Sequence, residues 1–118
     1  TDRDWDLAID RYGSTFDPTV GTQRFYHSRS FKVGVPFTNP ARYENPEADA
    51  LWDAAAIEVN PQKRREIFSK LQAVLLRDIP ILPQVVATRN ITSRTSVQGN
   101  APFATGSFDS FAQAWLAA

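Results

Sequence analysis

Two neighbouring stretches of the chain contain apolar residues at helical spacing. The first runs from about Pro46 to Val59, and the second from about Pro61 to Arg77. The first stripe consists of Ala48, Leu51, Trp52, Ala55 and Val59, and the second of Ile67, Phe68, Leu71, Val74 and Leu75. Residues three and four apart lie on one side of a helix, so this spacing predicts two amphipathic helices. Lys63, Arg64, Glu66 and Lys70 are expected on the outer, solvated face of the second helix.

Each predicted helix begins with the dipeptide Asn-Pro. The side chains of Asn45 and Asn60 can accept hydrogen bonds from the free N–H groups of a first helical turn. Pro46 and Pro61 then occupy the first helical position, where a missing N–H costs nothing. Because only Asn60 separates the two stretches, they are predicted to form a helical hairpin or corner rather than one long helix.

The remaining patterns predict strands and irregular structure. Apolar and polar residues alternate from Trp5 to Ile9, which is typical of a strand with one buried face. Residues 81–87 are predicted to form a buried strand, with Pro83 at an edge or a bulge. Residues 88–97 are predicted to form a second strand, and the tail is predicted to form a short helix or a final strand. Residues 22–42 are expected to be irregular. Together these elements predict an α/β or α+β fold: a small sheet with the helix pair packed on it.

Composition narrows the classes of function. Thirteen basic and thirteen acidic side chains cancel, so no global field points to nucleic acid or to an anionic membrane. The chain has 118 residues, enough for one domain, and it lacks cysteine, which excludes disulfides and thiolate chemistry. No apolar run is long enough to cross a bilayer, and the N-terminus has no apolar signal core.

Candidate catalytic and metal-binding residues each have a simpler interpretation. The acidic residues Asp2, Asp4, Asp6 and Asp10 lack the glycine and glutamate of a calcium loop and are expected to form a solvated strand face. His27 is the only histidine, so a structural zinc site is excluded, and we expect it in a loop or at the surface. Ser28 follows it, yet sequence neighbours rarely form a catalytic triad. No catalytic residue, metal or cofactor is therefore predicted.

The segment RYGST, after the first predicted strand, is the one candidate for ligand binding. Tyr12 offers an aromatic face and a hydroxyl, Gly13 leaves backbone groups accessible, and Ser14 and Thr15 offer donors and acceptors. The pattern by itself favours an ordinary turn whose tyrosine packs on the core.

The order of these motifs closely resembles the C-terminal signature of family 5 extracellular solute-binding proteins. DWDLAIDRYGSTFDP is similar to the family's strand and loop. The helical motifs follow as Tyr43, Asn45, Pro46, Glu47, Asp49, Leu51 and Ala55, and then as Arg65, Phe68, Gln72, Leu75, Asp78, Pro80 and Pro83. Members of this family are two-lobed receptors that deliver peptides, nickel or oligosaccharides to ABC importers.

The resemblance implies that this chain is the C-terminal portion of such a receptor. Residues 1–87 would belong to the second lobe, of the periplasmic-binding-protein type II kind, and about 88–118 would return to a missing N-terminal lobe. Tyr12, Gly13, Ser14, Thr15 and Asp17 would be the contacts to a peptide-like or other small polar solute. The implied partners are this solute and a membrane permease, with no nucleic acid, and the location is periplasmic or at the cell surface. A fragment with open sheet edges is also expected to self-associate.

Two alternatives stay open at this level. The same fold can serve as the ligand-sensing domain of a transcriptional regulator. The second alternative is a small hydrolase that uses His27 and an acidic residue. The family resemblance, in contrast, implies a protein without enzymatic activity.

Overall fold

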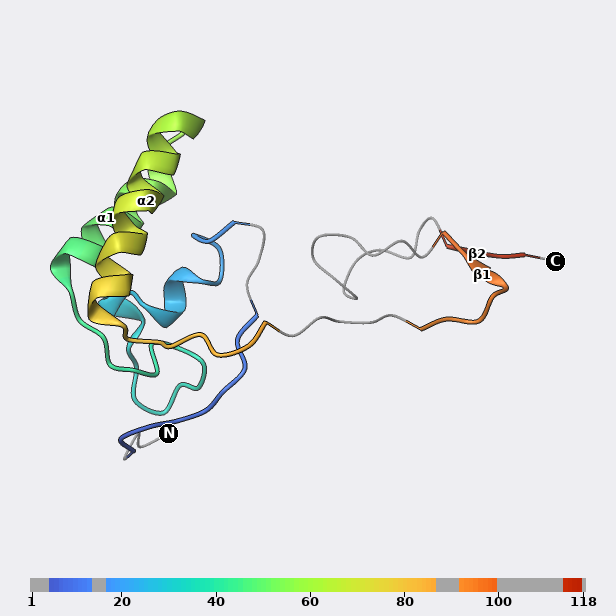
Figure 1. Cartoon of the computed structure of the whole chain (residues 1–118), viewed down its shortest axis with the longest axis horizontal. Helices are drawn as coiled ribbons and strands as arrows, with labels where there is room; N and C mark the ends of the chain where they lie inside the picture. The colour runs from blue at the N-terminus through green and yellow to red at the C-terminus, as the bar shows by residue number, and fades with distance from the viewer. Residues whose placement is uncertain (1–4, 14–16, 87–91, 100–113, 118) are drawn as a thin grey trace. The chain divides into compact units, whose positions relative to one another are not determined.

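The computed structural model describes residues 5–13, 17–86, 92–99 and 114–117, and the chain divides into two compact units, Thr1–Leu82 and Pro83–Ala118 (Figure 1). The first unit contains the 3₁₀ helices η1 (Gln23–Phe25) and η2 (Ser28–Ser30) and the helices α1 (Pro46–Ile57) and α2 (Pro61–Asp78). The second contains the strands β1 (Val97–Gln98) and β2 (Trp115–Leu116). The chain is thus a small mixed protein of helices and a two-stranded sheet.

The helix starts follow the Asn-Pro pattern. The side-chain oxygen of Asn45 accepts hydrogen bonds from the N–H groups of Glu47 (2.9 Å) and Ala48 (3.3 Å). Asn60 accepts in the same way from Gln62 (3.0 Å) and Lys63 (3.1 Å). These bonds satisfy amides that have no partner inside the helix, and both predicted caps are confirmed.

The C-terminal bounds differ slightly from the prediction. α1 ends at Ile57, because Glu58 is already extended and its carboxylate accepts the N–H of Asn60 at 2.7 Å. Val59 is consequently 92 % exposed and does not belong to the buried stripe. α2 ends where Ile79 adopts a left-handed backbone (φ 44°), directly before Pro80.

The core of the first unit lies between α1 and α2. Its buried members are Ala48, Trp52, Leu71 and Val74, and Tyr26, Tyr43, Leu51, Phe68 and Leu75 pack around them. The Trp52 ring lies 6.1 Å from that of Tyr26 and meets Phe68 edge-on at 6.2 Å, both within the range of favourable aromatic pairs. The predicted helical hairpin and most of its two stripes are confirmed.

An irregular segment, not a sheet, covers this hairpin. Among the described residues of Thr1–Leu82 none forms a strand, and Tyr26 and Tyr43 fill the place where a sheet was expected. The predicted irregularity of residues 22–42 is confirmed: this stretch contains η1, η2 and a glycine turn at Gly34 (φ 79°), and a second glycine turn at Gly21 (φ 96°) directly precedes it. Phe25 fixes this segment because its side chain is only 3 % exposed.

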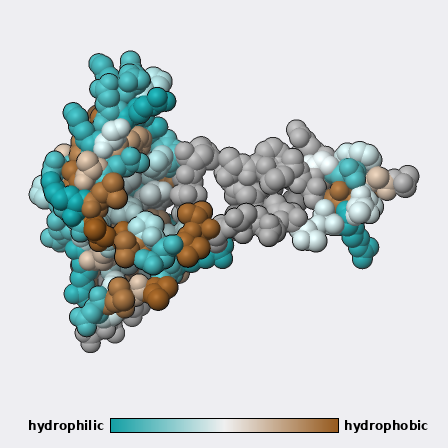
Figure 2. Space-filling model, viewed as in Figure 1, coloured by the Kyte–Doolittle hydropathy of each residue, from teal (hydrophilic) through white to brown (hydrophobic). Residues whose placement is uncertain are grey.

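The strands predicted at 5–9 and 81–87 are wrong in the part that the structure describes. Residues 5–9 and 81–86 form no strand, and Leu7, Ile9, Val85 and Val86 are largely exposed. A strand needs a neighbour for its backbone hydrogen bonds, and the described residues provide none for these segments. Residue 87 lies outside the described residues. The face drawn in Figure 2 shows apolar residues at the surface among hydrophilic ones.

In the second unit, β1 and β2 form an antiparallel pair with Val97 opposite Leu116 and Gln98 opposite Trp115. Of the strand predicted at 88–97, residues 88–91 lie outside the described part and only Val97 is in a strand. The tail forms a final strand at Trp115–Leu116, one of its two predicted forms; residues 100–113 and 118 are not described.

Candidate functional site

The predicted ligand loop is described in part. Ser14 and Thr15 lie outside the described residues, whereas Tyr12, Gly13 and Asp17 lie within them. The Tyr12 ring lies 4.5 Å from the ring of Phe25, so the tyrosine packs on the irregular segment. Nothing lies within 4 Å of a Cβ built on Gly13, so the backbone there faces open space. Tyr12 thus has a structural contact, and Gly13 leaves room beside it.

Asp17 forms a clamp with α2. Its two carboxylate oxygens accept from one guanidinium nitrogen of Arg64 at 2.9 and 3.0 Å, and Thr19 donates to it through its N–H and its hydroxyl. The same arginine donates through Nε to the carbonyl of Ala55, at the end of α1, at 2.8 Å. Arg64 therefore joins three parts of the first unit, and its expected place on a solvated helix face is wrong.

The hydrogen bond from Arg64 is the main reason why the pKa of Asp17 falls from 3.8 to about 2, with the Thr19 N–H as the next contribution. Asp17 is an anion at any physiological pH. Because Arg64 already neutralises that charge, a cationic group of a solute would compete with the guanidinium for Asp17. A role in solute binding therefore requires that this clamp open or that the solute use the remaining lone pairs.

A shallow pocket of about 160 Å³ lies beside the N-terminal part of the first unit. Its lining residues are Trp5, Asp6, Pro40, Ala41 and Arg42. Its lining includes an aromatic, an acidic and a basic residue, and this composition suits a small solute with both charges. Pockets that enclose a small molecule measure roughly 300–1,000 Å³, so this one does not enclose a whole ligand by itself.

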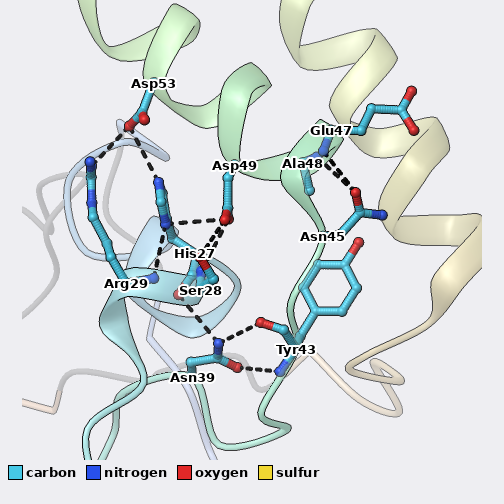
Figure 3. Close-up of polar contacts among 10 residues, drawn as sticks. All are labelled: His27, Ser28, Arg29, Asn39, Tyr43, Asn45, Glu47, Ala48, Asp49 and Asp53. Atoms are coloured by element: carbon cyan, nitrogen blue, oxygen red, sulfur yellow. Dashed lines mark hydrogen bonds and ion pairs between the residues drawn. The ribbon is translucent and has the colours of Figure 1, made fainter.

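His27 lies in the loop between η1 and η2, one of its two expected places, but it is buried rather than at the surface: the residue is 4 % exposed. Figure 3 shows the imidazole between two carboxylates of α1, with Asp49 at 3.2 Å from Nδ1 and Asp53 at 3.3 Å from Nε2. The guanidinium of Arg29 also reaches Asp53, at 3.0 Å. This group joins η2 to α1 and was missed because its members lie apart in the sequence.

Ser28 takes part in this cluster without a link to the imidazole. Both its N–H and its hydroxyl donate to the Asp49 carboxylate (Figure 3). Among the described residues, no hydrogen bond joins the Ser28 hydroxyl to the His27 imidazole. A nucleophilic serine needs its proton taken by a base such as histidine. The geometry is therefore that of an anchored loop rather than of an activated nucleophile.

Asn39 connects the cluster to the start of α1. This residue is fully buried, and its amide donates to the carbonyls of Tyr43 (2.7 Å) and His27 (3.3 Å) while its oxygen accepts the Tyr43 N–H at 2.9 Å (Figure 3). A buried amide with its groups satisfied fixes the backbone around it. Asn39 thereby fixes the turn of residues 40–42, which line one side of the pocket.

A second network joins the start of α1 to the end of α2. The Tyr43 hydroxyl and the Asn45 amide both donate to one oxygen of Asp78, each at 2.6 Å, and Arg77 donates to its other oxygen at 2.9 Å. Arg77 also contacts Glu47 at 3.3 Å. The sequence presented Tyr43, Asn45, Glu47 and Asp78 as separate motif positions, with Asn45 also a predicted cap, and it did not predict that they meet.

These contacts shift two pKa values in opposite directions. The bonds from Arg77, then Tyr43 and Asn45, lower the pKa of Asp78 from 3.8 to about 2. Burial first, and then the bond to Asp78, raises the pKa of the Tyr43 hydroxyl from 10.0 to about 12. Between these two pKa values the tyrosine stays a donor and the aspartate an acceptor.

The described residues contain no group of three or more histidine, aspartate or glutamate side chains placed to hold a metal ion. Among the helices in that same part of the chain, none is sufficiently long and apolar to span a membrane.

Comparison with known proteins returned no match: no family model, no curated protein and no solved structure matches the chain.

Proposed function

We propose that the chain is part of a solute-binding protein of the family 5 kind, which captures a peptide-like or other small polar solute for an ABC importer. In this proposal the chain contributes part of a type II periplasmic-binding-protein lobe, is not an enzyme, and works in the periplasm or at the cell surface. A permease and a second lobe would be its partners.

One observation supports this proposal most: motif residues far apart in the sequence converge in space. Tyr43 and Asn45 belong to the first helical motif and Asp78 to the second, and the three meet at one carboxylate oxygen. Phe68 and Leu75, from the second motif, pack against the core with Leu51 from the first. A signature whose members contact one another is the pattern expected of residues that maintain a common fold.

The pocket supports a shared rather than a complete solute site. Its volume of about 160 Å³ is below that of sites that enclose a small molecule. A receptor that closes two lobes around its solute needs only one wall from each. The isolated chain is therefore expected to bind solute weakly.

The test is a titration of the 118-residue chain with dipeptides, short oligosaccharides and nickel complexes, followed by amide chemical shifts. We expect millimolar binding by one class, with shifts at Tyr12, Gly13 and the pocket residues. Tyr12→Ala should abolish the shifts, whereas Tyr12→Phe, which keeps the ring contact with Phe25, should reduce them less. Nanomolar binding by this chain, or shifts centred on His27, would overturn the proposal.

The alternatives have separate readouts. Hydrolysis of a peptide or ester by the chain, lost in His27→Ala, would favour the hydrolase. Specific retention of operator DNA by the full gene product would favour a transcriptional regulator. The Ser28 hydroxyl donates to Asp49, which argues only against a hydrolase that uses Ser28 as its nucleophile.

A further inference from the structure

The segment Trp5–Asp10, here called the N-terminal segment, begins beside a pocket, is exposed along its length and is followed by a packed tyrosine. Trp5 and Asp6 line the pocket beside residues 40–42, and Tyr12, just after the segment, packs on Phe25. Between the pocket residues and Tyr12, Leu7 is 85 % and Ile9 97 % exposed. The chain thus presents a short span of backbone and apolar side chains to its surroundings.

The backbone of this span is unpaired in the part of the chain that the structure describes: the N–H and C=O groups of Leu7, Ala8 and Ile9 make no hydrogen bond there. Unpaired backbone groups beside exposed apolar side chains are the properties of a sheet edge, which is a ready template for another strand. The alternation of the sequence is that of a strand with one apolar face.

The two faces of the segment differ in chemistry. The chain bends at Asp6 and forms neither helix nor strand from Leu7 to Asp10. An extended backbone from Leu7 to Asp10 places Leu7 and Ile9 on one face and Ala8 and the acidic Asp10 on the other, with the acidic Asp6 at the bend before them. A partner strand must therefore match an apolar row and an acidic row. Cross-strand pairs of opposite charge stabilise a sheet, and like charges directly opposite destabilise it.

A second copy of the chain does not match both rows. Antiparallel pairing centred on Ala8 sets Asp6 of each copy opposite Asp10 of the other, and pairing centred on Leu7 sets Asp10 opposite Asp4. A register shifted by one residue sets Asp6 opposite Ile9, and parallel pairing in register sets each aspartate beside its copy.

We propose that the N-terminal segment is a docking strand for an extended segment of a partner polypeptide in which apolar residues alternate with Lys or Arg. Backbone hydrogen bonds supply the affinity of such strand addition, and the alternating side chains supply its selectivity. The partner's basic residues would lie over Asp6 and Asp10, and its apolar residues over Leu7 and Ile9. This proposal does not rest on a role in solute transport.

The probe is a labelled synthetic peptide in which lysine alternates with valine, titrated into the full chain and followed by fluorescence anisotropy. We expect saturable binding that weakens as salt rises, because the ion pairs are exposed and screened. A peptide with glutamate in place of lysine is the matched control and should not bind. Amide shifts should appear at Leu7, Ala8 and Ile9 and not at Val74.

Two variants separate backbone pairing from charge. Ala8→Pro removes a backbone donor and should weaken binding about tenfold, whereas Ala8→Ser keeps that donor and should not. Asp6→Asn with Asp10→Asn should weaken binding and flatten its salt dependence. Neither variant touches the helical hairpin, so an unchanged helical circular dichroism signal verifies folding.

Three results would overturn the proposal. They are equal binding of the lysine and glutamate peptides, no binding of the lysine peptide, and dimers in light scattering that persist in Asp6→Asn with Asp10→Asn while no peptide binds. The last would assign the segment to a second copy of the chain.

Discussion

The α1–α2 hairpin and the N-terminal segment are both amphipathic, yet only the hairpin buries its apolar face. A helix completes its backbone hydrogen bonds within itself, so two capped helices need only bring their stripes together. The N-terminal segment has a strand pattern, but a strand depends on a neighbour for every backbone bond. The contrast shows that an amphipathic pattern predicts a buried face only where the chain also supplies what covers it.

The largest expected effect tests the hairpin. Trp52→Ala should lower the free energy of unfolding by about 3–5 kcal/mol, the usual cost of removing a large buried aromatic side chain. Trp52 is 2 % exposed and contacts Tyr26 and Phe68. Chemical denaturation followed by circular dichroism measures the change. Leu76→Ala, on the exposed side of α2, is the control and should change stability by less than about 0.5 kcal/mol.

The Asp17–Arg64 clamp should give a smaller, pH-dependent effect. Asp17→Asn should cost about 1–2 kcal/mol at neutral pH, because a partly exposed, charge-assisted pair is lost. The folded-state pKa of Asp17 lies near 2, below the ordinary 3.8, so its stabilisation is present above about pH 4 and is lost as the pH falls towards about 2.

The measurement is thermal unfolding at several pH values between these limits. The variant should show a flatter acid slope than the wild type, although Asp78 keeps part of the slope since its pKa is lowered in the same way. Glu66→Gln, an exposed carboxylate on α2, is the matched control. An unchanged slope in Asp17→Asn would show that the clamp does not form in solution.

The caps should follow with a loss of about 1 kcal/mol. Asn60→Ala removes the acceptor for the N–H groups of Gln62 and Lys63 and lowers the stability of α2 by that amount. Asn60→Asp keeps an acceptor and is the control. Hydrogen exchange at those two amides should be faster in Asn60→Ala than in Asn60→Asp. Equal exchange in both variants would show that the cap does not stabilise the hairpin.

The smallest effect is expected in the N-terminal segment. Leu7→Ser with Ile9→Ser should change the free energy of unfolding by less than about 0.5 kcal/mol, because both side chains already face solvent. Denaturation measured as for Trp52→Ala gives the comparison directly. A loss of several kcal/mol would mean that the segment packs against the chain in solution, and it would erase the contrast with the hairpin.

Prediction from sequence succeeded where interactions are local. The caps at Asn45 and Asn60 and the facing stripes of α1 and α2 depend on residues a few positions apart, and they follow from helical spacing. It failed for residues 5–9 and 81–86, because the alternation of apolar and polar residues does not predict which strand, if any, lies beside them. Within the candidate site it proposed Tyr12, Gly13 and Asp17 as ligand contacts, which stays a prediction, and it did not indicate the packing of Tyr12 on Phe25 or the clamp from Arg64.

The His27 cluster and the Asp78 network could not be predicted for the same reason. A histidine without a spacing motif gives no signal for burial, and nothing in the sequence near His27 points to Asp49 or Asp53. The order of Tyr43, Asn45 and Asp78 in the sequence is part of the resemblance to a family. Their contact at one carboxylate oxygen could not be predicted from that order. Long-range polar contacts depend on how the helices pack, and packing is a property of the whole unit.

By itself, the sequence determined where the two helices begin, which of their faces are apolar, and the lack of cysteine chemistry, because these follow from side chains and short-range spacing. Only the tertiary structure decided that His27 is buried between carboxylates and that Arg64 turns inward to Asp17. It also decided that the alternating segment at the N-terminus stays exposed. The physical reason is that burial and ion pairing depend on which distant surfaces meet, and hydrogen bonding within a helix does not.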